Sequence, residues 1–91
     1  MLMKVIAQEL ASEGITCNIV APGMVYAGLT KAIYDRDPQF RTRADAAVPL
    51  GRMSSTAELA GSFTFLASEA GAYITGTTLL IDGGATLVRR T

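Results

Sequence analysis

The sequence predicts an α/β fold that contains a pair of parallel strands. Residues 15–21 are rich in β-branched side chains and carry no charge, which is typical of strands that helices cover on both faces. A second short apolar run spans residues 78–81, and a helix-length segment precedes it. A strand, helix, strand order makes a right-handed crossover, so we expect the two strands to lie side by side in one sheet.

Composition limits the chain to one domain at most. Of its 91 residues 49% are hydrophobic and 18% are charged, and the mean hydropathy is +0.32, which is too apolar for a disordered chain. Eight basic residues balance eight acidic ones, so no net field attracts nucleic acid or an anionic membrane. Arg89 and Arg90 near the end form a short basic tail, which we interpret as solvated.

The single cysteine indicates the kind of cellular compartment in which the protein works. Cys17 alone excludes an internal disulfide framework and indicates a reducing, cytoplasmic environment. Because it falls in the apolar stretch 15–21, we expect a packed and inert thiol. The first apolar run is too short for a signal peptide, and no run reaches the length of a membrane span.

The N-terminal segment is predicted to be a helix that leads into the first strand. Apolar residues recur on one face with Val5 beside them, at Leu2, Ile6 and Leu10. Gly14 can adopt a left-handed backbone and therefore stops the helix. The strand 15–21 follows, and Pro22 ends it because proline has no N–H for the ladder.

The middle of the chain, residues 24–52, is the least regular part. A short helix is predicted over residues 29–34. Asp37 as N-cap and Pro38 at the first helical position predict a second helix that extends toward residue 47. The charges between residues 35 and 45 alternate in sign, which favours a solvated surface.

The last helix has a clear start signal. Ser55 and Glu58 have capping-box spacing, in which each side chain satisfies a free amide of the first turn. The helix is predicted to extend to about Ser68, with an apolar stripe made of Leu59, Phe63 and Leu66.

The carboxyl end of the first strand is the place to look for a ligand. Open α/β sheets bind ligands at this edge, because backbone amides and helix N-termini converge there. The segment from Pro22 to Thr30 is therefore the candidate ligand-facing loop, and Gly23 would let its backbone approach a flat ring closely. On these residues alone, the alternative that Pro-Gly merely turns the chain stays open.

Six short segments, in this order, resemble the last third of the short-chain dehydrogenase/reductase family, which consists of nicotinamide-dependent oxidoreductases on a Rossmann fold. They are residues 7–10, 14–15 with 18–23, 48–52 with Glu58, 65–68, 73–76 and 82–84. The resemblance implies that residues 1–91 are the C-terminal portion of a single Rossmann-fold oxidoreductase domain. They would supply the last two strands of a doubly wound parallel sheet, with their helices.

The resemblance also implies a cofactor contact, with NAD or NADP as the cofactor. In the family the Pro-Gly segment, here Pro22 and Gly23, lies against the nicotinamide half. The backbone of the residue that matches Val25 contacts the carboxamide. A threonine often follows two residues later and hydrogen-bonds the same group, but Ala27 stands at that position here.

The segment 26–47 matches the family's variable substrate loop. Three apolar side chains in and beside it would line a pocket, although packing against the sheet explains them equally well: Met24, Leu29 and Ile33.

No catalytic residue is identified in this chain. The family uses a tyrosine, a lysine four residues later and a serine, together with a glycine-rich dinucleotide loop. None of the three tyrosines has a lysine at plus four and no such loop occurs, so these parts are expected before Met1. The chain has no histidine and its acidic residues are scattered, so we identify no metal site either. Asp82 is interpreted as a turn residue rather than a base.

Three functions from different classes remain open. The chain is part of an NAD(P)-dependent oxidoreductase for small alcohol or carbonyl substrates, or a self-association module, or a truncated product without activity. Family members commonly pair subunits through the last helix and strand, here residues 55–68 and 78–81, which predicts a homo-oligomer. The sequence leaves the substrate and the choice between NAD and NADP open.

Overall fold

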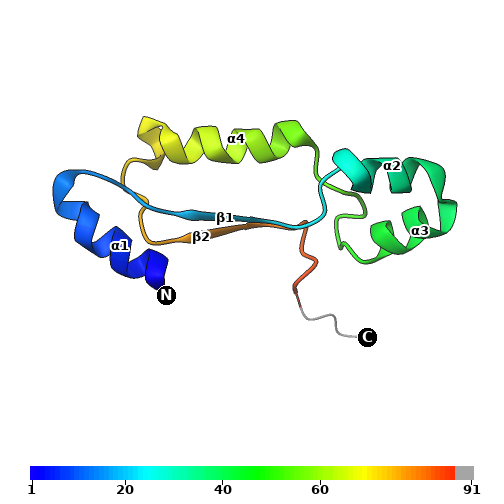
Figure 1. Cartoon of the computed structure of the whole chain (residues 1–91), viewed down its shortest axis with the longest axis horizontal. Coiled ribbons are helices and arrows are strands. Elements are labelled where there is room, and N and C mark those ends of the chain that lie inside the picture. The colour runs from blue at the N-terminus through cyan, green and yellow to red at the C-terminus, as the bar shows by residue number, and fades with distance from the viewer. Residues whose placement is uncertain (88–91) are drawn as a thin grey trace.

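The computed structural model describes residues 1–87, so the basic tail lies outside the described residues. The elements follow in the order α1 (Leu2–Leu10), the 3₁₀ turn η1 (Ala11–Glu13), β1 (Ile19–Pro22), α2 (Gly28–Arg36), α3 (Pro38–Ala46), α4 (Thr56–Ala67), η2 (Glu69–Gly71) and β2 (Thr78–Ile81). Figure 1 shows α4 along the two strands, α1 near their amino ends, and α2 and α3 beyond their carboxyl ends.

The two strands pair in parallel, as predicted. The register begins with Ile19 opposite Thr78 and ends with Pro22 opposite Ile81. Because the strands are parallel, the chain must cross back between them, and α4 lies on that crossover. The carboxyl ends of β1 and β2 therefore meet at one edge of the sheet.

The first strand is shorter than predicted, because it begins at Ile19 and not at Ile15. Asn18 explains the difference: its side-chain Nδ2 donates to the Ile74 carbonyl at 3.0 Å, and its Oδ1 accepts from the Thr77 N–H at 3.1 Å. At this level the side-chain bonds join the two segments together with one backbone bond, from the Gly76 N–H to the Cys17 carbonyl at 2.8 Å. Cys17 accordingly precedes the strand and is only half buried, which corrects the expected packed thiol.

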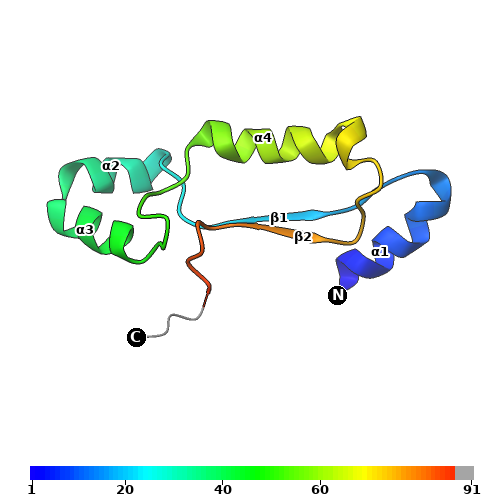
Figure 2. The ribbon, with the colours of Figure 1, turned by 180° about the vertical axis from the view of Figure 1, so that it is seen from behind.

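Only one face of the sheet is covered within residues 1–87. Paired residues of parallel strands share a face, and successive residues alternate between faces. Val20 and its partner Leu79 are half buried, whereas Ile19 is 43% exposed and Leu80 is 51% exposed. Figure 2, the view from behind, again shows α4 on one side of the strands. The helix layer expected on the second face is not supplied by these residues.

The apolar faces predicted for the two long helices are only partly buried. In α1 the buried residue is Ala7, at 3% exposure, whereas Leu2 is 73% and Val5 is 50% exposed. In α4 two members of the predicted stripe are half buried, Leu59 and Leu66, but Phe63 is 55% exposed and does not belong to it.

The helix boundaries depend on the predicted caps. Asp37 accepts hydrogen bonds from two backbone amides of α3, and the capping box of α4 is complete. Helix α1 ends at Leu10, earlier than Gly14, but Gly14 closes the following turn η1 in the left-handed conformation with φ 74°.

The shape is extended for a chain of this length. The radius of gyration is 16.2 Å, compared with about 12 Å for a compact domain of this size. The buried hydrophobic residues are few and dispersed: Ala7, Ala44, Val48 and Met53. Among the described residues, no helix is long and apolar enough to cross a membrane.

Candidate functional site

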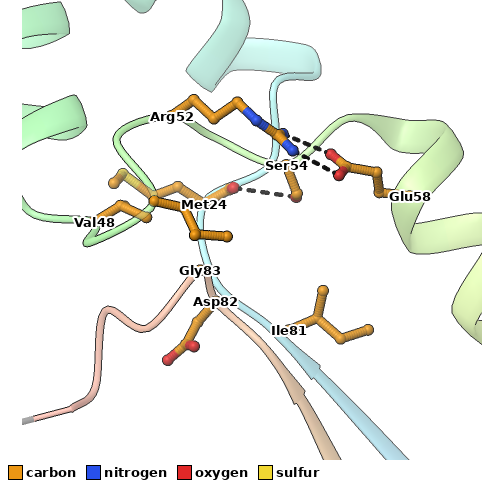
Figure 3. Close-up of a pocket in the computed structure, with 9 residues that line it drawn as sticks. Met24, Val48, Arg52, Ser54, Glu58, Ile81, Asp82 and Gly83 are labelled. Carbon is orange, nitrogen blue, oxygen red and sulfur yellow. Dashed lines mark hydrogen bonds and ion pairs between the residues drawn. The ribbon is translucent and has the colours of Figure 1, made fainter.

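A small pocket opens at the carboxyl ends of β1 and β2. Its walls come from the loop after β1, the turn before α4, the first turn of α4 and the end of β2 (Figure 3). This is the edge at which α/β sheets bind ligands. The residues that line it are Met24, Val48, Leu50, Arg52, Ser54, Glu58, Ile81, Asp82 and Gly83.

Gly23 joins the two strand ends. Its N–H donates to the Ile81 carbonyl at 2.9 Å, and a β-carbon at this position would lie 2.9 Å from Cβ of Asp82. The absent side chain thus allows the loop to pass close to Asp82. This close approach is a packing reason for glycine that requires no ligand.

Asp82 is a turn residue, as predicted. Its carboxylate accepts hydrogen bonds from the N–H groups of Gly84 and Thr86, each at 3.0 Å. Hydrogen bonding from Thr86, followed by that from Gly84, lowers the pKa of Asp82. A carboxylate with two amide donors and a lowered pKa is a poor proton acceptor at neutral pH. Figure 3 shows it turned away from Arg52 and Glu58.

Val25 forms a parallel bridge with Ser54. The Ser54 N–H donates to the Met24 carbonyl at 3.1 Å, and the Tyr26 N–H donates to the Ser54 carbonyl at 2.9 Å. In such a bridge the central residue directs its own N–H away from the partner. The Val25 carbonyl accepts from Ala27, but within residues 1–87 the Val25 N–H has no hydrogen-bond partner.

Ala27 is the N-cap of α2. Its backbone is extended, with φ −159° and ψ 160°, and its side chain offers no capping hydrogen bond. Of the three apolar residues predicted to line a pocket or pack on the sheet, Met24 lines the carboxyl-edge pocket. Leu29 is 76% exposed, so within the described residues it neither lines the pocket nor packs against the sheet. Ile33 is half buried but does not line the pocket.

Two tyrosines of this region are bound to carboxylates. The hydroxyl of Tyr26 donates to Asp35 at 2.6 Å, and that of Tyr34 donates to Asp45 at 2.9 Å. The hydrogen bond to Asp35 raises the pKa of Tyr26, and the bond to Asp45 does the same for Tyr34. A tyrosine that exchanges protons with a substrate needs a pKa nearer neutrality, so neither side chain is set up for that role.

The two rings also meet each other. Their centroids are 5.7 Å apart in an edge-to-face arrangement, with Lys31 over the ring of Tyr26 and Arg41 over that of Tyr34. These contacts connect the loop after β1 to α2 and α3.

Arg52 and Glu58 form a two-point ion pair at the mouth of the pocket. Arg52 Nη1 lies 2.7 Å from Oε1 of Glu58, and Nη2 lies 2.8 Å from Oε2 (Figure 3). Hydrogen bonding from Arg52, helped by the Ser55 N–H, lowers the pKa of Glu58 to about 2. Both partners are therefore charged throughout the physiological range.

Sequence reasoning missed three of these interactions. Ser54 gave no signal, because its bridge to Val25 joins residues far apart in the chain. The Tyr26–Asp35 bond likewise follows no local rule. Arg52 and Glu58 could have been paired from the sequence, since the capping box fixes Glu58 at the helix start, facing the turn that precedes it.

Within residues 1–87, no group of three or more histidine, cysteine, aspartate or glutamate side chains is placed to hold a metal ion. The polar side chains that line the pocket are the Arg52–Glu58 ion pair, Ser54 and Asp82, whose carboxylate is bound to backbone amides. Such groups orient a ligand, but they include no nucleophile paired with a base.

Comparisons with known proteins agree with this arrangement. A family model described as enoyl-(acyl carrier protein) reductase matches residues 1–86. The chain belongs to the short-chain dehydrogenase/reductase family. It corresponds to the C-terminal part of that Rossmann fold, as the sequence predicted.

Relatives and solved structures show how much of the family's length is present. The chain is 45% identical over 85 residues to the 3-oxoacyl-(acyl-carrier-protein) reductase FabG of Escherichia coli, covering 93% of this chain and 34% of that protein. The chain thus spans about a third of the length of the curated relatives it matches.

Several of the similar structures contain a nicotinamide cofactor, among them the following two. A putative 2-deoxy-D-gluconate 3-dehydrogenase from Agrobacterium tumefaciens with bound NADP has a TM-score of 0.81 and 34% identity, covering 92% of this chain and 34% of that one. A 4-hydroxyisoleucine dehydrogenase mutant in complex with NADH and succinate has a TM-score of 0.88 and 25% identity, covering 98% and 36%.

Proposed function

We propose that this chain supplies the nicotinamide side of an NAD(P)-dependent oxidoreductase for alcohol or carbonyl substrates. Pro22 and Gly23 lie against the nicotinamide, and the Val25 N–H donates to its carboxamide. The observation that carries the proposal is the Val25 N–H at the carboxyl edge of the sheet, which has no hydrogen-bond partner within residues 1–87. A main-chain donor held in one direction by the Ser54 bridge is suited to bind a planar amide oxygen.

In this proposal, residues 26–47 border the substrate. The tyrosine network attaches α2 and α3 to the loop after β1, so a substrate in this region would contact the same unit that holds the cofactor. The proton-transferring tyrosine and lysine and the dinucleotide loop come from the remainder of the oxidoreductase domain. The 91-residue chain alone is therefore expected neither to oxidise alcohols nor to reduce carbonyl compounds, with NAD or with NADP. The cytoplasm is the proposed compartment, because Cys17 is a free thiol.

A chimera tests this proposal directly. Residues 1–86 replace the matching third of the Escherichia coli FabG reductase, and cofactor binding is measured by fluorescence titration. We expect a dissociation constant within about tenfold of the parent enzyme, a difference of 1.4 kcal/mol or less. Val25→Pro removes the N–H and should weaken binding, whereas Val20→Ile in β1 serves as the matched control. A folded chimera that binds neither NADH nor NADPH would contradict the proposal.

Self-association is a second candidate function, supported by exposed apolar groups on α4 and β2. Phe63 and Phe65 on α4 are 55% and 44% exposed, and Leu80 on β2 is 51% exposed. Large apolar side chains that stay exposed on both elements support contact with a protein partner. We propose a homo-oligomer in which α4 and β2 contact a second copy.

A further inference from the structure

The Arg52 side chain closes a ring of hydrogen bonds around residues 52–55. Its Nη1 donates to Oε1 of Glu58 at 2.7 Å and to the Met53 carbonyl at 3.1 Å, and Nη2 donates to Oε2 at 2.8 Å. Oε1 also accepts from the Ser55 N–H at 2.8 Å. A planar guanidinium that meets a carboxylate at two points fixes orientation as well as distance.

Ser54 lies inside this ring and forms hydrogen bonds to the loop after β1, at the residues on either side of Val25. It donates to the Met24 carbonyl through its N–H at 3.1 Å and through its hydroxyl at 3.3 Å, and its carbonyl accepts from Tyr26. The peptide groups on either side of Val25 are thus both hydrogen-bonded to Ser54. The direction of the Val25 N–H depends on where Ser54 sits.

We propose that Arg52 and Glu58 are positioning residues for the cofactor-binding loop and act on Val25 through Ser54. This inference rests on the proposed function, because it assigns a purpose to the direction of the Val25 N–H. A donor held in its binding direction before the ligand arrives requires less ordering on binding.

Because the ion pair is exposed, its effect on the position of the loop can be measured apart from its effect on the stability of the fold. The side chains of Arg52 and Glu58 are 58% and 45% exposed, and exposed ion pairs contribute little to the free energy of unfolding. Loss of the pair should therefore alter the loop more than it alters the fold. Glu58→Gln retains an oxygen that can accept from the Ser55 N–H, so it removes the charge and spares the cap.

The test uses the chimera with Arg52→Lys or Glu58→Gln, because a lysine ammonium cannot pair with both carboxylate oxygens in the guanidinium geometry. Glu9→Gln on α1 is the matched control. Each protein is titrated with NADPH or NADH, and with the adenosine-side fragment that lacks nicotinamide. We expect the dissociation constant of the dinucleotide to rise about tenfold, the effect of one lost hydrogen bond, while that of the fragment stays unchanged.

Each outcome decides the inference. Equal weakening of dinucleotide and fragment would show a purely structural role and overturn it, and so would unchanged binding of both. If the unsubstituted chimera binds no cofactor, the proposed function fails, and amide exchange in the 91-residue chain decides the positioning role. There Glu58→Gln should speed exchange of the Tyr26 amide and leave the Gly23 amide unchanged. No change at Tyr26 would overturn the positioning role.

Discussion

Gly23 and Asp82 pack so closely that a β-carbon on residue 23 would lie 3.0 Å from Cα and 2.9 Å from Cβ of Asp82. The contact joins the residue after β1 to the residue after β2, and Asp82 also lines the carboxyl-edge pocket. It gives the Pro-Gly turn a structural role that is independent of its proposed contact with nicotinamide. A substitution at Gly23 therefore tests packing first and cofactor binding second.

Gly23→Ala should destabilise the chain, because the two strand ends must separate to admit the methyl group. Overpacking of this kind costs about 1–3 kcal/mol. Gly61→Ala is the matched control: Gly61 lies within α4, its β-carbon would meet no atom within 4 Å, and alanine in a helix stabilises by about 1 kcal/mol. Urea unfolding of both variants measures the difference. A Gly23→Ala midpoint equal to that of the unsubstituted chain would show that the strand ends can part without cost.

Ala27→Thr should act at two places. Threonine at the N-cap would accept a hydrogen bond from an amide of α2 and stabilise the fold by about 1 kcal/mol. In the chimera the same hydroxyl would reach the carboxamide that the proposed function places beside Val25, and tighten cofactor binding by about 1 kcal/mol.

Unfolding without cofactor and titration with cofactor separate these two effects. A gain in stability with no gain in affinity would mean that the hydroxyl caps α2 and the carboxamide is held elsewhere. A gain in affinity alone would place the hydroxyl on the ligand.

Glu58 should make stability depend on pH in an acid window. Its pKa is lowered from the ordinary value of 4.5 to about 2, mainly by hydrogen bonds from Arg52. A carboxyl group with a lower pKa in the folded state stabilises the fold above pH 4.5, and this contribution disappears as the pH falls to about 2.

The stability difference between the wild type and Glu58→Gln should therefore be constant near neutrality and shrink from pH 4.5 to 2. In Arg52→Gln the pKa of Glu58 should rise, and NMR titration of the carboxyl carbon measures it. An unchanged pKa in that variant would contradict the ion pair as the cause.

Local signals in the sequence predicted the helix boundaries well. Asp37 with Pro38 and Ser55 with Glu58 are short-range patterns, in which a side chain caps amides within three residues of itself. The parallel pairing of β1 and β2 followed from the order of elements, because a crossover helix between strands leaves one arrangement.

Interactions between distant residues were not predictable in the same way. The first strand starts late because the amide side chain of Asn18 binds residues 74 and 77. Helical spacing placed Phe63 in the buried stripe, but Phe63 is 55% exposed, and the sheet beside α4 has only two strands within residues 1–87. The Ser54–Val25 bridge joins a residue after β1 to a residue before α4, so it depends on how these two elements are placed.

The isolated chain should associate through α4 and β2. Within residues 1–87 the sheet has two strands, so each has an edge without a strand partner, and one sheet face is open. Few residues are buried, so a single copy has little apolar burial to offset its conformational entropy. Phe63→Ser removes a 55% exposed ring from the proposed contact and should lower the mass measured by light scattering at micromolar concentration.

Thr64→Ser, one residue along the same helix, is the control, and circular dichroism checks that both variants keep their helix content. A wild-type chain that is monodisperse, monomeric and cooperatively melting would refute association, and an oligomer that Phe63→Ser leaves intact would place the contact away from this face of α4.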